Sequence, residues 1–140
     1  MSTRCNIILR DENKNRKIYL YHHHDGYPEG VGADLAHFAM NWNKGYIYGV
    51  EELANRMIKG IESPLYGRVD NEYELTSCLH GDIEYLYIVR LEWDYEAKKN
   101  TIVLEAYETL WQDQYGEYAE SLLAIDGTIC RPISLTEKQD

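Results

Sequence analysis

Residues 17–42, KIYLYHHHDGYPEGVGADLAHFAMNW, decide how this chain folds, because they pass from a strand pattern through a turn into a helix pattern. From Lys17 to His23 apolar and polar side chains alternate, as they do in half-buried strands. Glycine and proline crowd residues 25–30, and apolar residues then recur at helical spacing from Val31 to Trp42. The stretch therefore predicts a β-strand that leads directly into a helix.

The neighbouring segments extend this unit in both directions. Thr3 to Arg10 also alternates, and the polar tract 11–15 has the composition of a hairpin loop, so the first two strands are expected to pair antiparallel. Downstream, Val50 to Ile61 repeats the helical spacing, and the Ser63-Pro64 pair ends it. We expect two helices to follow the second strand.

The second half of the chain is dominated by strand patterns. Strands are expected at 83–92 and 101–107, and 73–77, 121–125 and 128–133 are further candidates, whereas residues 109–120 show only weak helical periodicity. The Asp126-Gly127 pair predicts a tight hairpin. We expect a single α+β domain over residues 1–135 with an antiparallel sheet of about five strands, two helices inserted after strand 2 and packed on one face, and a flexible tail at 136–140.

The composition excludes several classes of protein. The chain has 140 residues, 44% of them hydrophobic, and only 3 prolines, which is typical of one globular domain and not of collagen-like or disordered chains. No apolar run approaches the roughly 20 residues of a membrane-spanning helix, and no secretory leader is recognised. The 3 cysteines are widely separated, which fits a reducing compartment. We therefore expect a cytoplasmic protein with no membrane partner.

The acidic charge is confined to one half of the sequence. Up to Asp70 there are nine basic and nine acidic residues, and after it five basic and fifteen acidic residues, so the net charge of −10 belongs to the second half. Such a field disfavours direct contact with nucleic acid and attracts basic protein surfaces. The expected partner-binding residues in that case are Glu92, Asp94 and Glu96. The alternative is a solvated acidic face without a partner.

Chemistry-bearing side chains are most concentrated at residues 21–32, where the strand joins the helix. Three glycines there would let an anion such as phosphate approach backbone N–H groups at the start of a helix. Cationic side chains of the neighbouring strands, including Lys17, would neutralise the phosphate, and a tyrosine would stack on a base. The candidate ligand-binding residues are Arg4, Arg10, Tyr21, His23, Asp25, Gly26, Tyr27, Gly30 and Gly32.

The same segment supports two other interpretations. His22 and His24 share one face of the strand beside Asp25, so these three residues are an alternative metal site, as in a metal-assisted hydrolase. In a purely structural interpretation, His22 packs in the core, the Asp25 carboxylate caps the turn, Gly26 supplies a positive φ and Pro28 begins the helix. No serine or cysteine has the sequence context of a catalytic nucleophile.

The first part of the chain resembles a group of small, mostly uncharacterised phage and bacterial proteins. These proteins open with a Thr-Arg strand and carry the motif YxHxDGYPxGxGxxL, which covers about the first 40 residues here. The matching residues are Thr3, Arg4, Tyr21, His23, Asp25, Gly26, Tyr27, Pro28, Gly30, Gly32 and Leu35. The resemblance implies a small cytoplasmic protein, in the host cell if it is phage-encoded, and it implies no established chemistry.

These observations lead to three functional hypotheses. The first is a non-catalytic phage or prophage protein that sequesters a nucleotide or cyclic-nucleotide signal, as in counter-defence. The second is an acidic inhibitor that mimics nucleic acid and binds a basic host defence protein. The third is the metal-assisted hydrolase at His22, His24 and Asp25. We expect no cofactor, lean towards a protein that is not an enzyme, and leave a homo-oligomer formed through the 13 tyrosines as an open alternative.

Overall fold

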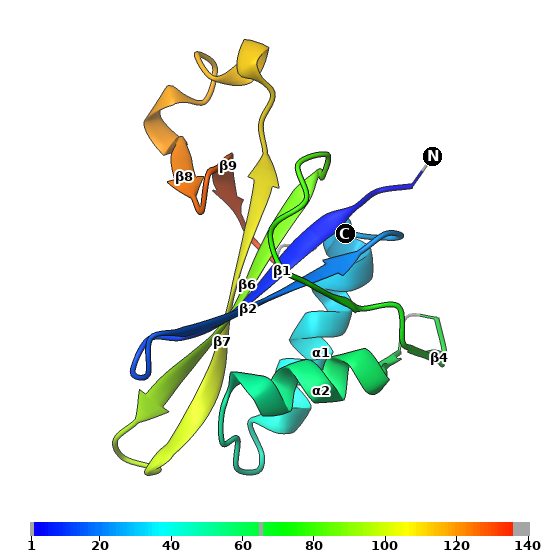
Figure 1. The fold of residues 1–140 in the computed structure, drawn as a ribbon, viewed down its shortest axis with the longest axis vertical. Helices are drawn as coiled ribbons and strands as arrows, with labels where there is room; N and C mark the ends of the chain where they lie inside the picture. Colours follow the sequence, from blue (N-terminus) through cyan, green and yellow to red (C-terminus); the bar gives the residue numbers. More distant parts are fainter. Residues whose placement is uncertain (1, 65, 136–140) are drawn as a thin grey trace.

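The structure, a computed structural model that describes residues 2–64 and 66–135, is built on a seven-stranded sheet curled into half a barrel (Figure 1). The strands are β1 (Cys5–Asp11), β2 (Arg16–His22), β3 (Ile61–Ser63), β4 (Arg68–Asp70), β5 (Glu74–Thr76), β6 (Tyr85–Asp94), β7 (Lys99–Thr109), β8 (Leu123–Ile125) and β9 (Thr128–Ile133). The helical elements are a π-helical turn η1 (Pro28–Gly32), α1 (Ala33–Trp42), α2 (Val50–Lys59) and two 3-10 turns, η2 (Gln112–Gln114) and η3 (Ala119–Ser121). The large sheet has the order β5-β2-β1-β6-β7-β9-β8, and β3 pairs with β4 separately.

The predicted five-stranded antiparallel sheet is wrong. The large sheet has seven strands, and it is mixed, because β1 pairs antiparallel with β2 but parallel with β6, with Cys5 opposite Tyr85. A parallel pair needs a long crossover, which here contains both helices and the β3–β4 hairpin. Local alternation identified most strands but carried no information on this distant pairing.

The main core lies between one face of the sheet and the two helices. α1 lies against β7 and β3, and α2 lies against β1 and β2 (Figure 1). The buried side chains of this core include Ile7, Leu9, Leu20, Leu35, Phe38, Leu53, Met57, Tyr87 and Val89. Burial of such apolar side chains is the dominant favourable contribution to folding. The two helices therefore cover the face of the sheet that β1, β2 and β7 form.

A smaller core lies on the opposite face of the same sheet. Ile8 and Ile88 are buried there with Cys130 of β9, so the central strands β1 and β6 are apolar on both faces. Burial on both faces is typical of strands with a parallel neighbour. Towards the far end of this face, polar side chains replace apolar ones.

Most predicted elements are found near their expected positions. Residues 109–120, where the pattern was ambiguous, hold the end of β7 and η2, and η3 follows. The predicted helix end at Ser63-Pro64 is instead the short strand β3, because Gly60 (φ 130°) ends α2 first. The predicted tail at 136–140 lies outside the described residues. Within the described part of the chain, no helix is both long and apolar enough to span a bilayer.

Candidate functional site

The turn between β2 and α1 is closely packed. Gly26 donates its N–H to the carbonyl of Thr3 (2.9 Å), and its own carbonyl accepts the Tyr87 hydroxyl (2.6 Å). A Cβ at Gly30 would lie 2.3 Å from the Asp25 carbonyl oxygen, and a Cβ at Gly32 would lie 2.7 Å from Leu135. The glycines are therefore needed for close contacts within the protein.

The backbone N–H groups predicted to bind an anion already have partners. Gly30 donates to the Tyr27 carbonyl (2.9 Å), and Val31 donates to the Asp25 carbonyl (2.8 Å). Gly32 donates more weakly to Tyr27 (3.4 Å). Nucleotide binding stays a prediction, without a preformed amide cup at this turn.

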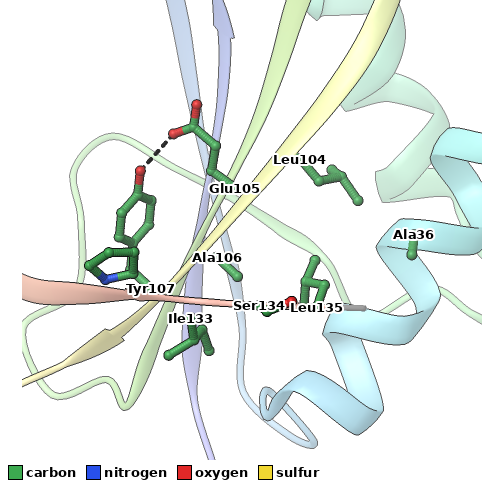
Figure 2. A pocket seen from close by; sticks show the side chains of 9 residues that line it. Ala36, Leu104, Glu105, Ala106, Tyr107, Ile133, Ser134 and Leu135 are labelled. Carbon is green, nitrogen blue, oxygen red and sulfur yellow. Dashed lines mark hydrogen bonds between the residues drawn. The ribbon is translucent and has the colours of Figure 1, made fainter. Parts of the chain in front are cut away.

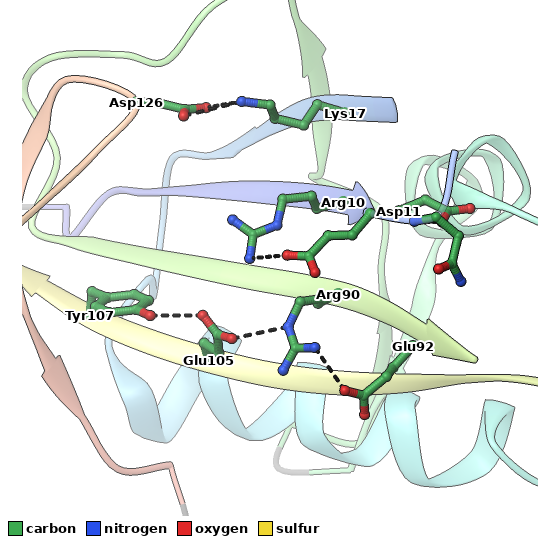
Figure 3. A network of polar contacts seen from close by, with 10 residues as sticks. Arg10, Asp11, Lys17, Arg90, Glu92, Glu105, Tyr107 and Asp126 are labelled. Carbon is green, nitrogen blue, oxygen red and sulfur yellow. Dashed lines mark hydrogen bonds and ion pairs between the residues drawn. The ribbon is translucent and has the colours of Figure 1, made fainter. Parts of the chain in front are cut away.

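The predicted cationic side chains do not meet at the turn. Arg4 faces Asp82 (3.4 Å) beside it, whereas Arg10 lies six residues further along β1, about 20 Å away. Figure 3 shows Arg10 on the polar part of the sheet face that points away from the helices, near Arg90 and Lys17. There it pairs with Glu12 (2.9 Å). The structure therefore separates the two arginines of the predicted phosphate site.

The three consecutive histidines also diverge. The His24 ring interacts with Ser2 (2.9 Å), and the His23 ring interacts with the Tyr21 hydroxyl (2.7 Å), both near the surface. The Asp25 carboxylate accepts the Tyr27 hydroxyl (3.1 Å). The side chains of the predicted metal set His22, His24 and Asp25 therefore do not converge on one point.

His22 instead joins a buried polar cluster formed with residues that the sequence did not single out. Its Nε2 lies 2.8 Å from Asp70 Oδ2, and its Nδ1 faces the His24 carbonyl oxygen. Oxygen atoms thus face both ring nitrogens and hold the imidazole in place from two sides. The other buried members are Asp34 at the start of α1, Ser63 of β3 and Tyr73. These residues come from three different elements: Asp34 from α1, Ser63 from β3 and Asp70 from β4.

The two buried carboxylates of the cluster have opposite electrostatic environments. Burial tends to raise the pKa of Asp70, but hydrogen bonds from His22 and from the Glu72 N–H outweigh it and hold the pKa below its usual value. Burial raises the pKa of Asp34, and the nearby Asp70 charge adds to the effect, although Ser63 opposes it. Ser63 lies beside Asp34 without an aligned hydrogen bond. Asp34 is therefore the poorly satisfied carboxylate of this cluster.

A second candidate site is a surface groove of about 340 Å³ at the adjoining end of the large sheet, which we call the acidic aromatic groove. Three aromatic side chains, Tyr27, Tyr85 and Trp111, line it together with the carboxylates of Glu84 and Glu108. Thr3, Thr109 and Gln114 complete the lining. Trp111 is 64% exposed, which is unusual for so large an apolar side chain.

The electrostatics of the acidic aromatic groove are negative. Burial raises the pKa of Tyr85, and the neighbouring charges of Glu108, Glu29 and Glu84 raise it further, although Arg131 opposes them. Glu108 pairs with Arg131 (2.6 Å) and Glu84 accepts the backbone N–H of Arg4 (2.7 Å). Among the described residues, neither Glu29 nor Glu84 has an ion-pair partner. The groove can therefore accommodate a cation.

The predicted partner-binding acids lie at the other end of β6. Asp94 lies nine positions after Tyr85 along β6, which places the β6–β7 turn about 30 Å from the groove. Glu92 pairs with Arg90 (3.2 Å), and the Asp94 carboxylate accepts the N–H groups of Glu96 and Ala97, so it stabilises the turn. The chain thus has two separate acidic surfaces at opposite ends of one strand.

The hollow shown in Figure 2 offers less chemistry than the groove. It measures about 490 Å³ and lies where α1 approaches β7 and β9, with Ala36, Leu104 and Leu135 around it. The one carboxylate among its lining residues, Glu105, is turned towards the hydroxyl of Tyr107 (2.7 Å) (Figure 2). This hollow is mainly apolar and brings no reactive groups together.

Comparison with known proteins assigns no family to this chain, so the functional argument rests on the geometry of its sites. No family model, no curated protein and no solved structure matches this chain. The resemblance of the first 40 or so residues to phage proteins therefore stays a prediction. The buried polar cluster and the acidic aromatic groove are two places where the described part of the chain gathers chemically capable side chains.

Proposed function

We propose that this chain is a non-catalytic binding protein whose acidic aromatic groove holds a positively charged segment of a partner protein. The observation that carries the proposal is the lining of the groove, where three aromatic rings and two carboxylates surround one hollow. Arginine and lysine side chains are attracted both to aromatic faces and to carboxylates. Few other ligand classes would use both features together.

The surroundings of the groove support a basic partner. The carboxylate of Glu84 has a hydrogen bond to Arg4 but no ion pair among the described residues, so it can accept one from a partner. The exposed Trp111 is the type of residue that contributes most energy to protein interfaces. The net charge of −10 would also accelerate association with a basic surface.

A nucleotide would fit this groove poorly, since its phosphates would meet Glu84 and Glu108. Capture of a nucleotide signal elsewhere on the protein stays a prediction, as does the phage counter-defence setting. In that setting a basic host defence protein would be the natural partner. A cytoplasmic location agrees with three cysteines that are all free thiols.

Isothermal titration with a short arginine-rich peptide tests the proposal. The peptide should bind the wild-type protein, and the affinity should fall as NaCl is raised from about 0.05 to about 0.5 M. Trp111→Ala should weaken binding about tenfold or more, and Glu84→Gln should weaken it by a smaller factor. An uncharged peptide of the same length should not bind.

Two variants at the β6–β7 turn serve as matched controls. Trp93 is 39% exposed. Trp93→Ala removes an aromatic ring outside the groove, and Glu92→Gln removes a carboxylate outside it. These changes should leave the affinity unchanged. If they abolish binding while the groove variants do not, the partner surface is the β6–β7 turn. If the peptide does not bind and only nucleotides raise the melting temperature of the protein, the proposal fails.

A further inference from the structure

We propose that His22, Asp70 and Glu72 form a binding site for a divalent transition metal ion at the end of β2, with Asp34 beside it. One ligand atom from each of the three residues lies within 4.8 Å of the others. The site shares no residue with the acidic aromatic groove, so the inference does not depend on the proposed function. It also differs from the predicted set, because Asp70 and Glu72 replace His24 and Asp25.

The orientation of His22 is that of a metal ligand. Its Nδ1–H is held by the His24 carbonyl, which directs Nε2 towards Asp70. Metal-binding histidines commonly fix their second nitrogen in this way. Two atoms that bind Zn²⁺ tetrahedrally at about 2.0 Å lie about 3.3 Å apart. The observed 2.8 Å between Nε2 and Asp70 Oδ2 would therefore have to open by only about 0.5 Å.

Buried oxygens next to this pair point independently to a ligand. Asp34 is 2% exposed and interacts electrostatically with His22 and Asp70, yet its Oδ1 has no hydrogen-bond partner among the protein groups described. The Tyr73 hydroxyl oxygen is in the same situation, and the Ser63 hydroxyl acts on Asp34 without an aligned hydrogen bond. Buried polar atoms normally have partners. A metal ion with a bound water would supply them.

The charge balance favours a cation. Three carboxylates, Asp34, Asp70 and Glu72, lie near one imidazole. Arg68 also acts on the two buried carboxylates, and its guanidinium lies over the Tyr66 ring as well. A divalent ion would bring a cluster with this excess of carboxylates closer to neutrality. Glu72 is exposed and gives the ion a path from solvent.

The donor set selects the class of metal. An imidazole nitrogen with carboxylate oxygens suits zinc and related transition metals, whereas calcium and magnesium prefer oxygen ligands alone. Zinc should therefore bind far more tightly than either of those ions. Cobalt(II) in the same site should give visible absorption bands that report its coordination.

Titration of chelator-treated protein without a histidine tag tests this site. Zinc should bind with one-to-one stoichiometry and raise the melting temperature. Glu72→Gln, which alters an exposed side chain, should weaken zinc binding roughly tenfold or more and change the cobalt spectrum. Glu74→Gln, an exposed carboxylate two residues further along, should change neither.

Two further variants exclude the surface histidines and a folding artefact. The double variant His23→Ala/His24→Ala should keep the zinc site, whereas Asp70→Asn, if its circular dichroism shows that it is folded, should lose it. The inference is overturned if the wild-type protein binds no zinc. It is also overturned if the two surface-histidine substitutions remove binding that Glu72→Gln and Asp70→Asn retain.

Discussion

Single residues determine whether the turn after β2 can receive a ligand. Asp25 has a positive φ of 54°, and its carbonyl accepts the Val31 N–H close to the backbone of Gly30. Gly30 has no side chain to obstruct this contact, since its absent Cβ would lie 2.3 Å from that carbonyl. The three glycines of the turn therefore act in packing, which the sequence pattern could not distinguish from ligand binding.

This packing role predicts a loss of stability when Gly30 is changed. Gly30→Ala should lower the free energy of unfolding by about 2–3 kcal/mol, because the new Cβ forces the Asp25 carbonyl to move. Gly45→Ala is the control, since a Cβ there meets no atom within 4 Å. Urea unfolding measures both. Equal stabilities of the two variants would show that the turn has room at Gly30.

Residue spacing contained one signal for the buried polar cluster that sequence analysis missed. Asp34 lies three residues after Val31 and four before Phe38, so it falls on the apolar face of the first helix. A carboxylate at such a position is buried and needs a partner. Its neighbours Ser63 and Asp70 are far away in sequence, and no local pattern places them beside it.

At the scale of elements, the part of the β7 edge that β9 leaves unpaired shows how the sheet is protected. β9 pairs with β7 only from Ala106 to Thr109, and the rest of that edge faces the segment after α1. The Asn43 side chain substitutes for a strand there, since its Oδ1 accepts the Ile102 N–H (2.7 Å) and its Nδ2 donates to the Ile102 carbonyl (3.2 Å). Uncovered edges of this kind promote association between chains.

Asn43→Ala should therefore expose the edge. The two unsatisfied backbone groups of Ile102 should lower the free energy of unfolding by about 1–3 kcal/mol. Light scattering should show increased self-association of the variant. Asn41→Ala, which removes an exposed amide that lies 2.9 Å from the His37 ring, is the control. If both variants stay equally stable and equally monodisperse, Asn43 does not protect the edge.

The elements themselves were largely predictable, and their assembly was not. The β1–β2 hairpin and both helices follow from local periodicity and turn residues. The parallel pairing of β1 with β6 joins residues about 80 positions apart, and nothing in the local pattern encodes it. This pairing makes the sheet mixed and brings Glu84 beside Arg4. The groove depends on that non-local contact, which explains why sequence analysis did not find it.

For the whole molecule, buried thiol and phenol groups predict that the free energy of unfolding falls at high pH. Burial raises the pKa of Cys130 to about 11 and also raises the pKa of Cys5 and Tyr87. A group whose pKa is raised by folding favours the folded state below its unfolded pKa, and this contribution is lost as pH rises towards the folded value. Stability should therefore fall above about pH 9, by about 1.4 kcal/mol per pH unit for each group still protonated in the folded state.

Urea unfolding at about pH 8, 9.5 and 10.5 would measure this loss. Absorbance of tyrosinate and thiolate in the native protein should stay low for the buried groups until unfolding begins. An unfolding free energy that is constant over this range would mean that these groups ionise as easily in the folded protein as in the unfolded chain.

The distribution of charge over the molecule is the basis of the functional proposal. One acidic surface combines aromatic rings with the carboxylate of Glu84, which has no ion-pair partner among the described residues. At the other, the β6–β7 turn, Glu92 pairs with Arg90 and Asp94 stabilises the turn. Composition predicted a basic partner for the acidic half but could not choose between these surfaces. The choice rests on side-chain geometry.

Chemical-shift mapping of the ¹⁵N-labelled protein tests that choice most directly. Addition of the arginine-rich peptide should shift the Trp111 indole N–H and the backbone amides of Glu84, Tyr85 and Thr109, and leave the Trp93 indole N–H unchanged. Shifts confined to residues 92–96, or shifts that appear only when a nucleotide is added and cluster at residues 25–32, would contradict the account.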